Sequence, residues 1–277
     1  MKKILVATDL SARSDRAILR ALKLAKEFKA YLKIVHVVDQ DLPKALLEET
    51  KKIAHKEIGY SVKGKTTGIK FDVEIAEGVP HLDILRIAND ENFDLVVLGL
   101  HRHVDSGEPI VGKLIDRIVK NSHKPILVVR DHAEEEYENI LVGVDFNIHS
   151  KRSLQFAFDF FKDANFHLVH SYHMPFLGTM GNYETIENQL KKSCQDDLDQ
   201  MLEDVISDIH AKKSSYKIKK KVVKGSIFEV LSLEMTKIKP ELLVLGTHAR
   251  SGFAKVVSLN VTENFLINPS CDLLIIS

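Results

Sequence analysis

The runs ILVATD at residues 4–9 and ILVGVD at residues 140–145 decide the fold of this 277-residue chain. Each run is short, apolar and β-branched, ends in aspartate, and is followed by a helical pattern. Further landmarks on either side of these runs recur in the same order along both halves of the chain. They are IVH at 34–36 and LVH at 168–170, Gly78 and Gly225, LVVLGLH at 95–101 and LLVLGTH at 242–248, and ILVV at 126–129 and LLII at 273–276. The sequence therefore predicts a tandem repeat, with units at residues 1–132 and 137–277 joined by a short acidic linker.

The strands of both repeats are near-continuous apolar runs without alternation of polar and apolar residues. Such runs are typical of strands covered by helices on both faces. Strands that alternate with helices favour parallel pairing through right-handed crossovers. We expect an α/β fold in which each unit is an open, twisted, parallel five-stranded sheet with helices on both faces, a Rossmann-like arrangement.

Composition narrows the class of protein. The 39 basic and 39 acidic side chains give zero formal net charge, which disfavours a nucleic-acid binder or a polybasic membrane anchor. The two cysteines, Cys194 and Cys271, lie too far apart in sequence to suggest a disulfide framework or a thiolate zinc site. The N-terminal run is a strand pattern rather than a signal peptide, and no stretch reaches the roughly 18 apolar residues of a membrane helix. A soluble cytoplasmic protein is expected.

The ends of the first and fourth strands of each repeat carry the candidate ligand-binding residues. Ligands of open parallel sheets sit beyond the carboxyl ends of the strands, where the strand order reverses. Asp9 and Asp145 end the first strands, and Gly99 and Gly246 end the fourth. A glycine there lets backbone approach a ligand, and the aspartate can accept hydrogen bonds from a ribose or an adenine. The alternative is that both aspartates only cap the helices that follow, and the residues alone favour neither.

The order of these landmarks, with GTHARSGF at residues 246–253 and NPSC at 268–271, resembles the universal stress protein family. The resemblance extends over essentially the whole chain, twice. It implies a fold of the adenine nucleotide α-hydrolase type and a phosphate loop G-x2-G-x9-G-[ST] after the fourth strand. It also implies that the first-strand aspartate and Val38 lie at the nucleotide.

The phosphate loop of domain one matches this pattern in part. Gly99 and Gly112 stand for the first and third glycines, whereas Arg102 replaces the second and Lys113 replaces the hydroxyl residue. The two cations could neutralise phosphate charge, or they could be ordinary surface residues. ATP or AMP is the cofactor that the resemblance suggests for domain one.

Domain two keeps Gly246 but has Ala249, Leu259 and Asn260 at the other three positions of the loop. A leucine at the third glycine occupies space that backbone and phosphate need to share. We expect domain two not to bind ATP in the usual way.

Two common catalytic and metal motifs, the G-x-S-x-G elbow and H-E-x-x-H, are missing from the sequence. His167, His170 and His173 alternate between strand faces, so hydrogen-bonded imidazoles are favoured over metal ligands. We hypothesise a non-enzymatic stress-response protein with a nucleotide or small-ligand crevice. The alternatives are an ATP-hydrolysing or phosphate-transferring enzyme of the same superfamily, and a carrier of a more apolar ligand.

The last strand of each repeat, at residues 125–130 and 272–277, is an apolar edge, and exposed edges tend to pair. The family resemblance implies that these two strands pair within one chain as a pseudo-dimer. Two chains could then form a homodimer.

Overall fold

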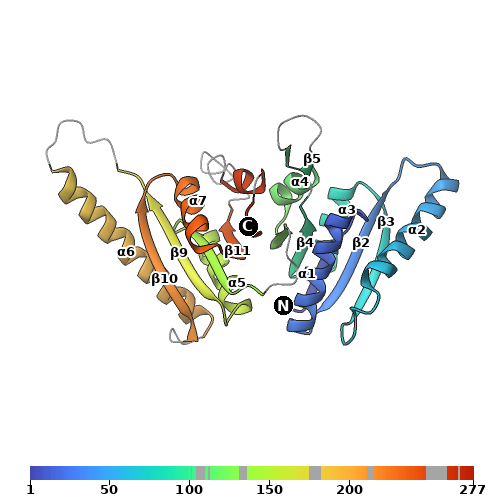
Figure 1. The fold of residues 1–277 in the computed structure, drawn as a ribbon, viewed down its shortest axis with the longest axis horizontal. Helices are drawn as coiled ribbons and strands as arrows, with labels where there is room; N and C mark the ends of the chain where they lie inside the picture. The colour runs from blue at the N-terminus through green and yellow to red at the C-terminus, as the bar shows by residue number, and fades with distance from the viewer. Residues whose placement is uncertain are drawn as a thin grey trace. The chain divides into compact units, whose positions relative to one another are not determined.

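A computed structural model of the chain describes residues 1–100, 102–103, 110–111, 113–130, 136–174, 182–210, 215–247, 261–267 and 269–277. The chain divides into two compact units. Unit 1 comprises residues 1–135, 265–275 and 277, and unit 2 comprises residues 136–264 and 276. Figure 1 labels many helices and strands of these units and colours the chain from blue at the N-terminus to red at the C-terminus.

Unit 1 contains a sheet with the strand order β12-β7-β4-β1-β2-β3. Its strands are β1 (Lys3–Ala7), β2 (Tyr31–Asp39), β3 (Phe71–Gly78), β4 (Leu95–Gly99), β7 (Ile126–Val129) and β12 (Asp272–Ile276). The pairs from β7 to β3 are parallel, and β12 is antiparallel to β7. The helices are α1 (Ala12–Phe28), α2 (Lys44–Val62), α3 (Pro80–Asp90) and α4 (Lys113–Asn121). A separate two-stranded ribbon pairs β5 (Arg102–His103) with β6 (Ile110–Val111).

Unit 2 repeats this plan with the strand order β10-β9-β8-β11, all parallel. The strands are β8 (Asn139–Val144), β9 (Asn165–Tyr172), β10 (Lys217–Lys224) and β11 (Leu242–Gly246). The helices are α5 (Ile148–Phe160), α6 (Tyr183–Asp208) and α7 (Ile227–Ile238). Residues 272–275 of β12 belong to the second repeat by sequence but to unit 1 in the structure, where β12 pairs with β7.

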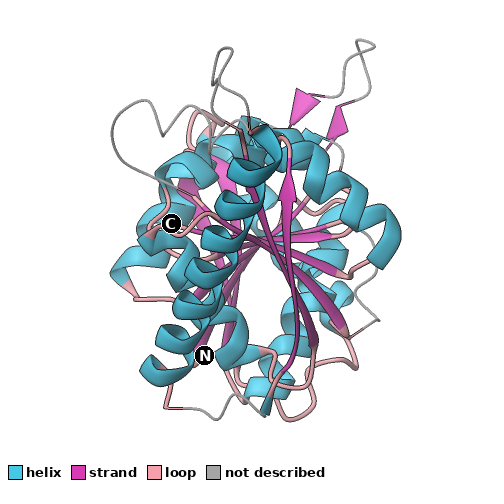
Figure 2. Cartoon of the chain, turned by 90° about the vertical axis from the view of Figure 1, so that its left-hand side faces the viewer, coloured by secondary structure: helices cyan, strands magenta, loops and turns pink. Residues whose placement is uncertain are grey.

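Strand order fixes the layers of each sheet. In unit 1 the chain moves from β1 outward to β2 and β3, then returns to β4 and β7 on the other side of β1. Right-handed crossovers in opposite directions place their helices on opposite faces. Helices α1 and α2 accordingly contact each other, as do α3 and α4. The strands form the inner layer and the helices the outer one, as Figure 2 shows by colour.

The cores of the two units are filled differently although their strands match. In unit 2 the fully buried ring of Phe158 on α5 packs edge-on against Phe166 at 4.6 Å and is stacked on Tyr216 at 4.7 Å. The equivalent positions of the first repeat are Leu22 and Leu32, both buried. Aromatic rings bury more area than leucine and restrict each other's orientation. Unit 2 therefore relies on an aromatic cluster where unit 1 uses aliphatic packing.

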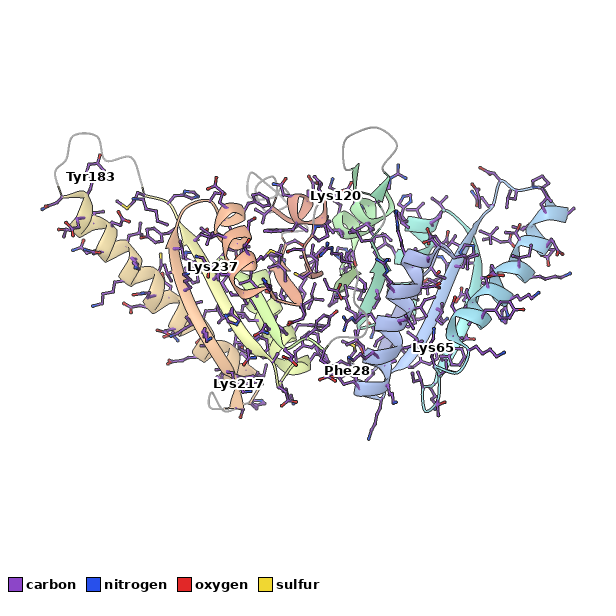
Figure 3. All side chains as sticks on the ribbon, viewed as in Figure 1. Phe28, Lys65, Lys120, Tyr183, Lys217 and Lys237 are labelled. Atoms are coloured by element: carbon purple, nitrogen blue, oxygen red, sulfur yellow. The ribbon has the colours of Figure 1, made fainter. Side chains whose placement is uncertain are left out.

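The outer edge strands of the two sheets carry opposite charges. In β3 the charged side chains are acidic: Asp72, Glu74 and Glu77. In β10 they are five lysines, beginning with Lys217, which Figure 3 labels. Charged side chains on an edge strand discourage pairing with another sheet. Both edges are thus protected, each with its own sign of charge.

The buried side chains that pair with these edge strands also have opposite charges in the two units. In unit 1 the buried Lys33 of β2 pairs with Glu74 at 2.9 Å and also with Glu91. Burial opposes the charged form of Lys33, but hydrogen bonds with Glu91 and Glu74 outweigh that cost, so its pKa is raised. In unit 2 the buried Glu234 of α7 accepts from Lys221 at 2.7 Å.

His167 occupies in β9 the position that Lys33 occupies in β2. Burial lowers the pKa of His167, and the charge of Lys219 lowers it further, against a smaller opposing effect of Glu234. A histidine that is harder to protonate in the folded state than in the unfolded state gives stability that is lost as pH falls.

We therefore expect unit 2 of the wild-type protein to lose stability as pH falls below about 6.5, the ordinary histidine pKa. The variant His167→Gln should show a shallower loss over this range, because no proton is taken up at that position. Urea denaturation of both proteins from neutral to mildly acidic pH measures the difference. Parallel pH profiles for the two proteins would contradict the expectation.

Among the described helices, none combines the length and apolar character that crossing a membrane requires.

Candidate functional site

The candidate site of each unit lies at the carboxyl ends of its central strands. The strand order reverses between β1 and β4 in unit 1, and between β8 and β11 in unit 2. At such a reversal, the helices that follow the two strands leave on opposite faces and open a crevice between their first turns. Asp9 and Gly99 lie at this end of unit 1, and Asp145 and Gly246 lie at the corresponding end of unit 2.

In unit 1, Asp9 holds the cap of α1 in place. Its Oδ1 accepts hydrogen bonds from Ser11 N at 3.1 Å and Ser11 Oγ at 2.7 Å. Ser11 is the N-cap residue, and its Oγ accepts from Ser14 N at 3.3 Å. Asp9 thus orients the capping residue instead of capping the helix itself.

Unit 2 has the same arrangement with an asparagine as the cap. Asp145 accepts from the backbone N–H of Asn147 at 3.3 Å and from its side-chain amide. Asn147 Oδ1 then accepts from Ser150 N at 2.8 Å. Both aspartates are exposed, so supporting the cap leaves carboxylate surface accessible to a ligand.

The residue after each aspartate has a left-handed backbone. Leu10 has φ 65° and Phe146 has φ 61°, a conformation that costs a non-glycine residue free energy. It turns the chain sharply between the strand and the helix cap. Its recurrence in both units marks this turn as a shared feature of the repeat.

Two equivalent histidines complete the turn. His36 Nδ1 lies 2.8 Å from the carbonyl oxygen of Thr8, and His170 Nδ1 lies 2.7 Å from that of Val144. A carbonyl oxygen can only accept, so Nδ1 must carry the proton in both rings. This fixes each half-buried ring beside the end of the first strand. The sequence predicted no site role for His36, although the matching histidine of the second repeat was a signal for one.

The turns of the two units differ at the residue that follows the aspartate. In unit 2 the Phe146 ring lies 4.1 Å from the His170 ring, centroid to centroid, with 31° between their planes. Unit 1 has Leu10 at the same position. Unit 2 therefore presents a paired aromatic surface at this turn.

The strand-end glycines serve the packing of the first helix. A Cβ added to Gly99 would lie 3.0 Å from Arg13 O and Ser14 Cα. A Cβ on Gly246 would lie 2.8 Å from His149 C and Ser150 N. From the sequence alone, both glycines are expected to let the backbone approach a ligand. The described contacts give a different reason, because helix backbone fills the space.

The remaining positions of the predicted nucleotide site are placed only in part. Val38 is buried near the end of β2. Arg102 lies in β5 and Lys113 begins α4, but their side chains, and Gly112 as a whole, lie outside the described residues. Ala249, Leu259 and Asn260 of the second phosphate loop also lie outside them.

Metal ligands do not gather in the part of the chain that the structure describes, where no three His, Cys, Asp or Glu side chains converge. Cys194 and Cys271 are both buried and form no disulfide.

Comparison with known proteins gives one family. The model of the universal stress protein family matches residues 1–130 and again residues 136–277. Universal stress protein MJ0531 of Methanocaldococcus jannaschii is 33% identical over 144 residues, which is 48% of this chain and 85% of the relative. Universal stress protein MJ0577 of the same organism is 30% identical over 154 residues, 47% of this chain and 94% of the relative.

Among solved structures, a universal stress protein from Archaeoglobus fulgidus matches with a TM-score of 0.72 at 16% identity, covering 99% of this chain and 98% of that one. This likeness extends over both repeats and confirms the α/β fold predicted from the sequence. The chain belongs to the universal stress protein family and consists of two tandem domains of that family.

Proposed function

We propose that this protein is a non-enzymatic stress-response protein that binds an adenine nucleotide, ATP or AMP, in the crevice of unit 1. The observation that carries the proposal is the turn shared by both units. In each, a strand-end aspartate, a left-handed residue and a hydrogen-bonded histidine lie where the strand order reverses. Strain and side-chain hydrogen bonds are maintained at functional sites more often than elsewhere.

The phosphate loop is the reason to assign the nucleotide to unit 1. By family resemblance its residues would be Asp9 and Val38 at the nucleoside, with Gly99 and Gly112 near the phosphates. Arg102 and Lys113 would add positive charge for the phosphates. Asp145 and Gly246 are the counterparts in unit 2, whose loop has Leu259 at the third glycine position.

Catalysis is not part of the proposal. The buried hydroxyl of Ser14 lies 2.8 Å from Thr8 Oγ1 and donates to Ser11 O at 2.8 Å, so no histidine or carboxylate activates it. Among the described residues no nucleophile, base and orienting group come together.

The proposed assembly is a pseudo-dimer made by the last strands of the two repeats. The support is the pairing of β7 with β12, in which Leu127 lies opposite Leu274. These two leucines are equivalent in the repeat, and so are the residues flanking them. An antiparallel pair centred on equivalent residues has the register of a two-fold dimer.

The test is calorimetric titration of the whole chain with ATP. We expect one equivalent bound per chain. Asp9→Ala should weaken binding by about 10-fold or more, because a hydrogen bond to a charged group is worth about 1.5–3 kcal/mol. Asp145→Ala is the matched control, since it removes the same cap support in unit 2 and should leave ATP affinity unchanged.

Two further variants and one assay separate the alternatives. Ser11→Ala removes the α1 cap but keeps the carboxylate, so it should weaken ATP binding less than Asp9→Ala. An equal loss with Asp145→Ala, or no binding at millimolar ATP, would refute the nucleotide proposal. Steady release of phosphate during incubation with ATP would favour the enzyme alternative, provided Asp9→Ala abolished it.

A further inference from the structure

A buried ion pair joins α1 to the C-terminal strand. Arg20 Nε lies 3.3 Å from Asp272 Oδ2, and the two side chains are only 3% and 4% exposed. The other carboxylate oxygen, Oδ1, accepts from Arg130 N at 2.9 Å. A buried charge that loses its partner is strongly destabilising. A strand in this place must therefore supply a carboxylate for the buried Arg20.

Two more contacts extend from this pair along the start of β12. Arg130 Nη1 donates to Ser270 O at 2.7 Å, and Arg16 Nη1 donates to Arg130 O at 3.1 Å. We call Arg16, Arg20, Arg130 and Asp272 the charge lock. Three of its members come from the first repeat, and the only acidic one comes from the second.

The Arg20–Asp272 pair of the charge lock has no equivalent in the other repeat. Because β7 and β12 pair through equivalent residues, a symmetric dimer would repeat the Arg20–Asp272 contact on the opposite side. The equivalents there are Phe156 for Arg20 and Pro125 for Asp272. Neither carries a charge, so the strand pair is two-fold in its backbone register but one-sided in its buried charges.

We infer that the charge lock selects the partner of β7, so that the first repeat accepts the C-terminal segment 270–276 of this chain and excludes a second copy of itself. Two first repeats paired through β7 would bury two arginines, each facing a proline. Two second repeats paired through β12 would bury two aspartates, each facing a phenylalanine. Both pairings leave charges without partners. The inference rests on the proposed pseudo-dimer and adds the residues that restrict the pairing to unlike repeats.

The test measures which halves associate when both are free to pair with either kind. A specific protease site is placed within residues 131–135 of the whole chain, the folded protein is cleaved there, and the halves are refolded together from urea. Native mass spectrometry then distinguishes the mixed pair from pairs of two first or two second halves. We expect the ratio of mixed pairs to like pairs, which is one in a statistical mixture, to rise by at least about 100-fold, the effect of one unpaired buried charge.

The variant Arg20→Met with Asp272→Leu removes both charges and keeps apolar bulk. It should shift the refolded mixture toward one to two to one, the statistical ratio. Arg86→Met is the matched control, because it removes an exposed ion pair with Asp83 in the same unit and should keep the mixed pair dominant.

The results also separate this inference from the pairing on which it rests. Halves that come apart on cleavage in the wild-type protein would overturn the pseudo-dimer itself. Halves that stay associated but mix statistically would overturn only the charge lock.

A second measurement uses the intact chain and needs no refolding of halves. Urea denaturation of Arg20→Met, Asp272→Leu and the double variant gives a double-mutant cycle. Each single change should lower the folding equilibrium constant by at least about 100-fold, and the double variant should recover most of that loss. Strictly additive effects would show that the two side chains are not coupled, against the inference.

Discussion

Replacing Phe158 by alanine is expected to lower the free energy of unfolding of unit 2 by about 3–5 kcal/mol, the usual cost of emptying a buried aromatic site. Phe158 is fully buried and touches Phe166 and Tyr216 on two sides. Neither neighbour can fill the cavity without leaving its own contacts. The loss should therefore lie near the upper end of that range.

Hydrogen exchange with peptide resolution measures this effect unit by unit. Faster exchange should appear in β8, β9 and α5 of the variant, while β1 and β2 of unit 1 keep their protection. Phe156→Ala is the matched control on the same helix, because Phe156 is only half-buried. Equal losses for Phe158→Ala and Phe156→Ala would show that the aromatic cluster is not the centre of the core.

Replacing Gly246 by valine should cost unit 2 about 3 kcal/mol, the upper part of the range for overpacking. The added Cβ would meet the backbone of His149 and Ser150 at 2.8 Å, and backbone cannot rotate away as a side chain can. Helix α5 must shift, and its N-cap residue Asn147 moves with it. The variant should therefore disturb the crevice as well as lower stability.

The control for this prediction is Gly143→Val in the same sheet. A Cβ there would meet the ends of the Leu245 and Leu231 side chains, which can change rotamer. Urea denaturation followed by circular dichroism compares the two variants, and Gly246→Val should have the lower midpoint. If Gly143→Val proved the more damaging, the close approach of α5 to β11 would not be the constraint on Gly246.

The tandem fold could be predicted because each strand has a recognisable local sequence pattern. A run such as residues 4–9 is apolar on both faces, and five such landmarks in one order leave little freedom for another topology. The destination of the last strand could not be read in this way. Its place beside β7 was implied only by the family resemblance, and contacts such as Arg20 with Asp272 join residues far apart in the sequence.

The candidate site was predictable in location but not in detail. Asp9 and Asp145 were expected at strand ends, and the structure places them there. Each accepts a hydrogen bond from the N-cap residue two positions later in the chain. The role of Gly246 depends on how closely α5 approaches β11, a distance that no local pattern encodes. The role of His36 could not be predicted because its hydrogen bond is to Thr8 O, which lies 28 residues away in the sequence.

The opposite charges of β3 and β10 bear on how a chain with two similar halves avoids mixing them during synthesis. Domains fold as they emerge, and repeated sequences are prone to exchange segments with one another. In unit 1, Lys33 lies opposite Asp72 of β3. A nascent β10 laid beside β2 in that register would set Lys219 against Lys33, and like charges directly opposite are destabilising. The charge reversal thus disfavours the pairing of β10 with β2 of the other half.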